Sequence, residues 1–358
     1  MSRKTALATT VRIAPLGFGL ALLACVVTRL GVHSILRMLV DMRWSLVPVL
    51  VLYTGHEMSR ATALMWCVRG RNVLSFVEAF LIRLSGEAVE CLTFTGPMLS
   101  EPMKAWLLER TGLELSEGLS ATLTEYLASM VTGAVTAVIG VGYVLLALHP
   151  VGPVRVAAIV ILSSMSVFLG FMTIAVATRI RMASMLVNVF IRRTIPGLVA
   201  IEDALIRTTR EPPRRFLAIM SAELAAQAFL GLELWALLAS LHLPCPLARA
   251  ALMEGVMKFM NAGAFFVPGQ AGVAEGSYAV IFSVFGLPAA AGVTLSFARR
   301  VRTFGTALVG VVALIALRRS PKSNSGRIPR THAADDAKRS GEAVAVTGRR
   351  PPVWLSVR

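Results

Sequence analysis

The chain has 358 residues, of which 56% are hydrophobic and 16% charged, and its mean hydropathy is +0.70. Soluble domains carry about 25% charged residues, so this composition excludes an ordinary water-soluble domain and predicts an all-α, polytopic membrane protein. The formal net charge of +16 is concentrated in two arginine-rich blocks, residues 179–215 and 318–358. Such blocks mark the cytoplasmic face of a membrane protein, and no aromatic interleaving or known nucleic-acid-binding fold accompanies them.

Six apolar segments are each long enough to cross the membrane, which takes roughly 20 apolar residues for about 30 Å of hydrocarbon. The first, residues 11–30, follows Arg3, Lys4 and Arg12. No small-residue cleavage site comes after it, so we expect a retained signal-anchor helix. The other expected spans are residues 44–67, 119–148, 154–178, 216–241 and 289–317.

Two further apolar segments, residues 73–108 and 247–285, are long enough to enter the membrane twice, and glycine and proline break each in its middle. If the first of them crossed only once, the arginine block at 179–215 would face outward, against the positive-inside rule. We therefore predict two re-entrant hairpins that enter from opposite faces, an inverted repeat that in transporters marks a mid-membrane binding site. The helix-break residues are Gly96, Pro97, Pro268, Gly269 and Gly272.

The expected organisation is a membrane domain over residues 1–317 with both termini in the cytoplasm. Residues 179–215 alternate arginine with apolar side chains, which predicts an interfacial helix on the cytoplasmic face. Residues 318–358 are polar and lack apolar periodicity, which predicts a disordered tail. Arginine greatly outnumbers lysine, which is typical of a GC-rich bacterial genome, so the bacterial plasma (inner) membrane is the expected location.

Ionisable residues recur inside the predicted hairpins, although each costs about 2.5–3.5 kcal/mol at the centre of a membrane helix. Each hairpin carries a row of three polar residues at positions i, i+4 and i+7, which share one helical face. One interpretation is that each row neutralises itself and holds helices together. The other is that the two rows line a shared hydrated cavity. The rows are Arg83, Glu87 and Glu90 in the first hairpin, and Glu254, Lys258 and Asn261 in the second.

Arginines in the last expected span are the strongest candidates for binding a phosphate or carboxylate, because guanidinium binds such groups bidentately. A helix is expected to begin near Val273, and its N-terminus would suit an anionic headgroup. Glu275 lies in the first turn of this helix. It either accompanies a bound headgroup or simply neutralises one of the arginines of the last span. These arginines are Arg299, Arg300 and Arg302. Other embedded groups, for which structural pairing is an alternative, are His56, Glu57, Arg60, Glu125, Glu223, Gln227 and Glu233.

Two stretches resemble the signatures of a known family. Residues 265–304, "FFVPGQAGVAEGSYAVIFSVFGLPAAAGVTLSFARRVRTF", resemble the second signature of the lysylphosphatidylglycerol-synthase transmembrane, or flippase-like, membrane protein family. Residues 95–126, "TGPMLSEPMKAWLLERTGLELSEGLSATLTEY", are similar to its first signature, in which a glycine/proline break precedes a charged stretch. Val-Pro-Gly and Ala-Arg-Arg are most similar to the hopanoid-associated branch. Larger relatives carry a soluble aminoacyl-transferase domain, for which about 40 tail residues are too few.

The resemblance implies a lipid translocase that moves a polar or anionic lipid through a charged mid-membrane cavity. No ATP-binding G-x-x-x-x-G-K-[ST] motif is present, so movement would be downhill or ion-coupled, with Glu87, Glu90, Glu254 or Glu275 as candidate proton carriers. The alternatives are a non-catalytic partner of a lipid-modifying enzyme and an enzyme acting on lipid headgroups. An enzyme would need a convergent catalytic set, which the sequence does not indicate.

Membrane lipids are the expected partners, with a lipid-biosynthesis enzyme as a further candidate, and no cofactor or metal is expected. The predicted cavity residues are Arg83, Glu87, Glu90, Glu101, Lys104, Glu125, Glu254, Lys258, Asn261, Glu275, Arg299, Arg300 and Arg302.

Overall fold

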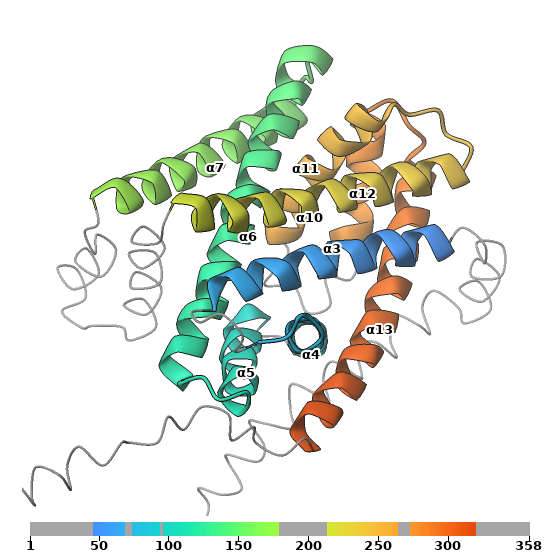
Figure 1. Cartoon of the computed structure of the whole chain (residues 1–358). Coiled ribbons are helices and arrows are strands. Elements are labelled where there is room, and N and C mark those ends of the chain that lie inside the picture. Colours follow the sequence, from blue (N-terminus) through green and yellow to red (C-terminus); the bar gives the residue numbers. More distant parts are fainter. Residues whose placement is uncertain (1–45, 69–73, 94–95, 179–212, 264–272, 320–358) are drawn as a thin grey trace, which may run out of the picture.

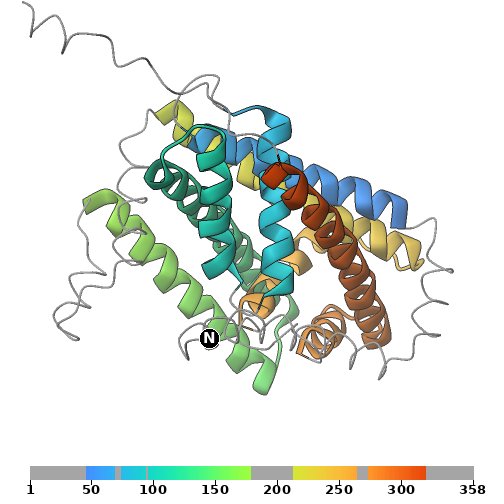
Figure 2. The ribbon, with the colours of Figure 1, turned by 90° about the horizontal axis from the view of Figure 1, so that it is seen from below.

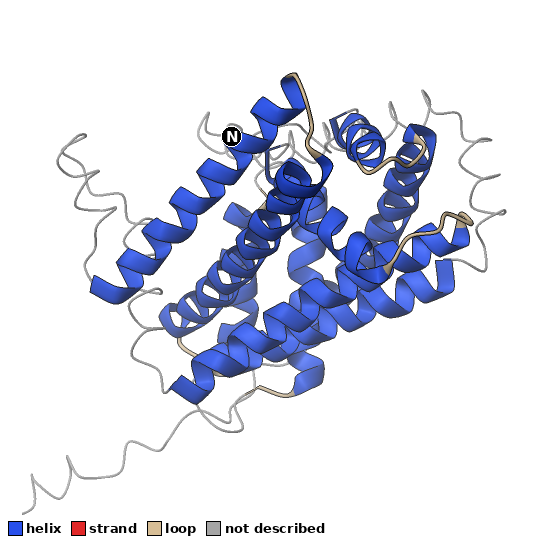
Figure 3. Cartoon of the chain, turned by 90° about the horizontal axis from the view of Figure 1, so that it is seen from above, coloured by secondary structure: helices blue, strands red, loops and turns tan. Residues whose placement is uncertain are grey.

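The computed structural model describes the chain except residues 1–45, 69–73, 94–95, 179–212, 264–272 and 320–358 (Figure 1). Every regular element in the described part is a helix (Figure 3), which confirms the all-α prediction. The expected first span, interfacial segment and tail lie outside the described residues, apart from a few at their edges. The helices are α3 Leu46–Cys67, α4 Phe76–Leu92, α5 Pro97–Arg110, α6 Leu115–Tyr143, the π-helical turn η1 Val144–Leu148, α7 Pro153–Thr178, α10 Pro213–Ser240, α11 Leu247–Gly263, α12 Val273–Val284 and α13 Ala289–Arg319.

Four helices are long and apolar enough to cross a membrane: α6 with η1, α7 up to Ile174, α10 and α13. They match four of the six predicted spans, as expected for a polytopic helical membrane protein. The second predicted span forms α3, which carries ionisable residues in its middle. These are His56, Glu57 and Arg60.

The first broken segment forms two short helices, as predicted. Helix α4 begins with a capping box, in which the Ser75 hydroxyl accepts from the backbone N–H of Glu78 and the Glu78 carboxylate accepts from the backbone N–H of Ser75. Helix α5 has proline as its first residue, where no backbone N–H is needed. Gly96, immediately before it, has φ of +47°, in the region that favours glycine. The break therefore falls at the expected Gly-Pro pair.

The second broken segment forms α11 and α12, and α12 begins at Val273, as predicted. The expected break residues between the two helices, Pro268, Gly269 and Gly272, lie outside the described residues. Both segments are thus pairs of short helices, while their insertion from opposite faces of a membrane stays a prediction.

The same order of elements occurs twice in the chain. A long helix, two short helices and a second long helix form α3 to α6 and again α10 to α13, with α7 between the two halves. Helices α3 and α10 lie side by side at the centre and run antiparallel, since the start of α3 packs on the end of α10 (Figure 1). Helix α4 packs along α13 (Figure 2), and α11 packs along α6, so the two halves interlock.

Glycines let the interlocked helices approach closely, a device that membrane helices use where backbones must touch. On α13, a Cβ at Gly310 would collide with the carbonyl oxygen of Leu84 on α4. On α11, a Cβ at Gly255 would collide with the carbonyl oxygen of Thr136 on α6. The two equivalent interfaces are therefore built on backbone contact rather than on large side chains.

Replacing Gly310 with alanine is expected to lower the midpoint of thermal unfolding in detergent. The new methyl group meets backbone, which cannot move aside as a side chain would, and overpacking of this kind costs about 1–3 kcal/mol. The matched control is Gly305→Ala on the same helix, where a Cβ would meet nothing within 4 Å. That control should be neutral or slightly stabilising, because alanine favours the helix by up to about 1 kcal/mol. Equal midpoints for the two variants would contradict the close approach of α4 and α13.

Candidate functional site

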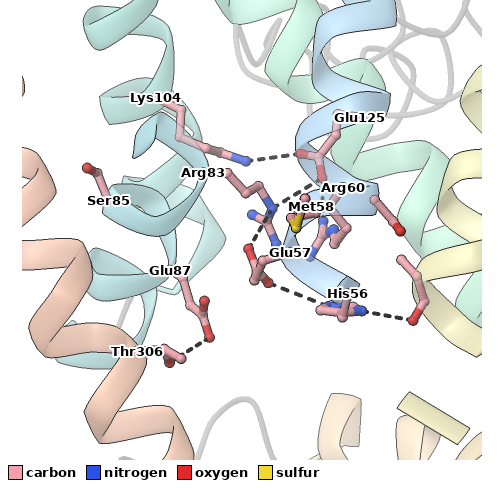
Figure 4. Close-up of polar contacts among 12 residues, drawn as sticks. His56, Glu57, Met58, Arg60, Arg83, Ser85, Glu87, Lys104, Glu125 and Thr306 are labelled. Carbon is pink, nitrogen blue, oxygen red and sulfur yellow. Dashed lines mark hydrogen bonds and ion pairs between the residues drawn. The ribbon is translucent and has the colours of Figure 1, made fainter. Parts of the chain in front are cut away.

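Glu125 on α6 is the centre of a first group of buried charges (Figure 4). Its side chain is 0% exposed, and its carboxylate is shared by three cations. Arg60 Nη2 lies 2.6 Å from Oε1, Lys104 Nζ lies 3.1 Å from Oε2, and Arg83 Nε lies 3.7 Å from Oε1. Lys104 also lies 2.8 Å from Glu101 Oε1, one turn earlier on α5. One carboxylate thus ties α3, α4 and α5 to α6.

Helix α3 adds a carboxylate and an imidazole to this group. Glu57 Oε2 lies 3.5 Å from Arg83 Nε, which offsets part of the excess positive charge. His56 Nδ1 lies 2.9 Å from the carbonyl oxygen of Ala226 on α10. Because a carbonyl only accepts, Nδ1 carries the hydrogen, and Nε2 lies 3.5 Å from Glu57 Oε1. These contacts fix α3 against α10 at the middle of the molecule.

Helix α10 presents two further buried polar residues toward α3. Glu223 Oε2 lies 3.7 Å from Arg60 Nε. Gln227, one turn further along, is only 7% exposed, yet neither its amide oxygen nor its amide nitrogen has a hydrogen-bond partner among the described residues. A buried amide without partners is costly. An apolar side chain at this position would therefore serve the packing of the helices better than glutamine does.

Arg299 on α13 is the centre of a second group. Its Nη2 lies 2.6 Å from Glu254 Oε2 on α11, and its Nε lies 3.7 Å from Glu233 Oε1 on α10. Its Nη1 donates a 3.1 Å hydrogen bond to the hydroxyl of Tyr278 on α12. Arg302, one turn later, pairs with both oxygens of Glu233. This group therefore ties α10, α11 and α12 to α13.

The two groups have the same plan with the charges reversed. In each half, the second long helix carries a central ion, and the first long helix and the first hairpin helix each carry one of its counter-ions. In the first half, Lys104 on the second hairpin helix is a third. We call these sets the first and second triads. The first triad is Glu125 with Arg60 and Arg83, and the second triad is Arg299 with Glu233 and Glu254. The first is rich in cations and the second in anions, at equivalent places of a repeated architecture.

Tyr53 on α3 joins the two groups. Its hydroxyl donates to Glu87 Oε1 on α4, and its ring lies under the guanidinium of Arg302, 3.7 Å from the ring centroid. The hydroxyl of Thr306 on α13 lies 3.3 Å from the same oxygen of Glu87 and 3.0 Å from the carbonyl oxygen of Thr303, so its one hydrogen is shared between these two acceptors. The other oxygen of Glu87, Oε2, is buried without a hydrogen-bond partner among the described residues. Glu87 thus lies at the junction of the two halves.

Most of the predicted cavity residues whose side chains are described meet in these groups. Glu90 is exposed, and Arg300 and Lys258 are half-buried on α13 and α11. Asn261 and Glu275 lie on described helices, but their side chains lie outside the described residues. Those that the structure brings together are Arg83, Glu87, Glu101, Lys104 and Glu125 around the first triad, and Glu254, Arg299 and Arg302 around the second.

Two members of the polar rows pair with residues on other helices. Arg83 pairs with α3 and α6, and Glu254 pairs with α13, so in the described part of the chain these two residues form their ion pairs between helices. Several group members were outside the predicted cavity set. Glu57, Arg60, Glu223 and Glu233 were recognisable as ionisable residues within apolar segments, but Tyr53 carries no such sequence signal.

A family model described as the lysylphosphatidylglycerol synthase TM region matches residues 12–310 of the chain. This match covers both halves of the repeat up to Gly310 of α13, and so includes both triads. No curated protein and no solved structure gives a significant match.

Proposed function

Because the chain belongs to the lysylphosphatidylglycerol synthase TM-region family, we propose that it is a translocase that moves a polar or anionic lipid across the membrane. The observation that carries the proposal is the pair of buried triads at the junction of two interlocked halves. Apolar residues of similar volume can replace buried ion pairs without loss of stability, and charges inside membrane segments are costly. A bundle that only had to keep its shape would therefore not need them.

The proposed path follows the central pair α3 and α10, which carries Arg60 of the first triad, Glu233 of the second triad, and Gln227. A headgroup phosphate would replace carboxylates as the partner of an arginine, since guanidinium forms the same bidentate bonds with either. In the first triad, Arg60 and Arg83 share the Glu125 carboxylate, so a phosphate that entered there would take over one of these arginines from Glu125. Acyl chains would remain in the bilayer. The repeated architecture supports exchange between two states, as in transporters built from inverted repeats.

The test uses purified protein in vesicles of phosphatidylglycerol and phosphatidylethanolamine with a trace of fluorescent nitrobenzoxadiazole-labelled phosphatidylglycerol. Dithionite, which does not cross the bilayer, bleaches only the probe in the outer leaflet. Bleaching should stop at about half of the signal in protein-free vesicles and should go well beyond half when the protein is present. A bleached fraction equal to that of protein-free vesicles, with the protein folded by size-exclusion chromatography, would contradict translocation of this lipid class. It would favour the alternative of a non-catalytic membrane partner.

A further inference from the structure

Glu87 differs from the other buried glutamates of the two groups in the partners of its carboxylate. The other six each have a lysine or arginine nitrogen as an ion-pair partner. Among the described residues, the partners of Glu87 are the hydroxyls of Tyr53 and Thr306 instead. Both hydroxyls lie within hydrogen-bond distance of Oε1, with that of Thr306 shared with the carbonyl oxygen of Thr303, and Oε2 is left buried without a donor.

An ionised carboxylate in such a place would lack compensation on one oxygen. Burying a charge without a counter-ion and a complete set of hydrogen bonds is strongly unfavourable. A proton on Oε2 removes the charge at the oxygen that has no donor, while Oε1 keeps its contacts with the hydroxyls of Tyr53 and Thr306. The geometry of the site therefore matches the neutral acid, and water is the source and the acceptor of the proton.

We propose that Glu87 is a proton-binding site that couples lipid movement to a transmembrane proton gradient. The coupling part of this proposal rests on the proposed translocation, whereas proton binding itself does not. The site is built from both halves of the repeat, since Tyr53 and Glu87 belong to the first half and Thr306 to the second. A change in the charge of Glu87 therefore acts directly on the interface between the two halves, which has to rearrange during transport.

The charged groups that act on Glu87 come from its own helix and from the two helices that pack on this face. Helix α3 contributes Glu57, α13 contributes Arg302, and α4 itself contributes Arg83. Helix α5 also packs on α4, and its Lys104 lies against Gly86. The ammonium group of Lys104 pairs with Glu101 and Glu125.

Arg302 is the cation that links the protonation of Glu87 to the second half. Its guanidinium is paired with Glu233 and covers the ring of Tyr53, whose hydroxyl is bonded to Glu87. When Glu87 is neutral, Glu233 holds Arg302 without competition. When Glu87 loses its proton, it competes with Glu233 for the same guanidinium. Protonation of Glu87 therefore favours the contact of α13 with α10, and loss of the proton favours the contact of α13 with α4.

Proton binding is tested directly, without any transport, by infrared spectroscopy of the purified protein as the pH is varied. The variant Glu87→Gln keeps the size of the side chain and an acceptor oxygen but cannot take up a proton. The matched control is Glu117→Gln, which removes an exposed carboxylate from the first turn of α6. We expect a carbonyl band of a protonated carboxyl group that Glu87→Gln loses and Glu117→Gln keeps. Identical spectra for wild type and Glu87→Gln across the pH range would overturn the proposal.

Coupling is tested in the vesicles described above, with an imposed pH gradient and with potassium and valinomycin holding the membrane potential at zero. For one proton per lipid, one pH unit should shift the steady-state distribution of the probe between the leaflets by up to about tenfold. The shift caused by the gradient should be lost in Glu87→Gln. An undiminished response in Glu87→Gln would overturn the coupling. A wild type that moves no probe but shows the Glu87 band would instead overturn the proposed translocation and leave proton binding supported.

Discussion

Replacing Glu125 with glutamine is expected to be the most damaging conservative substitution in the described part of the chain. The change preserves volume but removes the negative charge that Arg60, Arg83 and Lys104 share. Breaking a buried ion pair by removing one partner costs about 3–5 kcal/mol, and here three cations lose their common anion. Since native proteins are stable by about 5–15 kcal/mol, a large fall in the midpoint of thermal unfolding is expected, measured by size-exclusion chromatography of heated samples in detergent.

The exposed carboxylate of Glu117, on the same helix as Glu125, provides the control. Glu117→Gln should shift the unfolding midpoint little, because an exposed charge in the first turn of a helix contributes about 0.3–1 kcal/mol. If Glu125→Gln unfolded at the temperature of the control, the first triad would not be holding the helices of its half together.

Removing both members of the pair formed by Arg299 and Glu254 is expected to cost less than the sum of the two single changes. Arg299→Gln leaves the Glu254 carboxylate buried without the guanidinium that lies 2.6 Å away, and Glu254→Gln leaves that guanidinium with an excess of positive charge. Each single variant should lose about 3–5 kcal/mol. The double variant should recover about 0.5–3 kcal/mol of the sum, the usual range of coupling between contacting residues.

The unfolding midpoints of the four proteins in this double-mutant cycle give the coupling, and the lipid assay on the same samples gives the function. We expect the double variant to be more stable than the sum of losses indicates and still slow in moving the probe. Strictly additive losses of stability would contradict the Arg299–Glu254 contact. Unchanged movement of the probe in a folded double variant would show that the second triad serves structure alone, as a scaffold would require.

Local features of the sequence were enough to predict where helices start and stop. A Gly-Pro pair marks the start of α5, and the start of α12 at Val273 follows from the glycines and proline before it. The presence of charges within apolar segments was also visible. A Gly-Pro pair is a local signal, because glycine allows the backbone conformation before the helix and proline suits its first position. A single proline or glycine is not enough, since Pro102 lies inside α5 and Gly310 inside α13.

The partners of those charges were not predictable from spacing. Arg83 and Glu87 share a helical face, as expected, but Arg83 pairs with residues far away in the chain, on α3 and α6. Such pairs depend on how the two halves interlock, which no local pattern encodes. Tyr53 was missed for the same reason, because a single tyrosine in an apolar helix gains its role only from Glu87 and Arg302 on other helices.

The opposite signs of the two triads make the balance of charge a property of the whole polypeptide. Two identical copies of the first half would bring two cation-rich triads together, and two copies of the second half would bring two anion-rich triads together. In the actual chain, Arg60 of the first half takes part of its counter-charge from Glu223 of the second. Each half also holds counter-ions of its own, Glu57 and Glu101 in the first and Arg302 in the second. The opposite signs of the triads therefore decide which half can face which, and the pair of Arg60 with Glu223 forms only where two unlike halves meet.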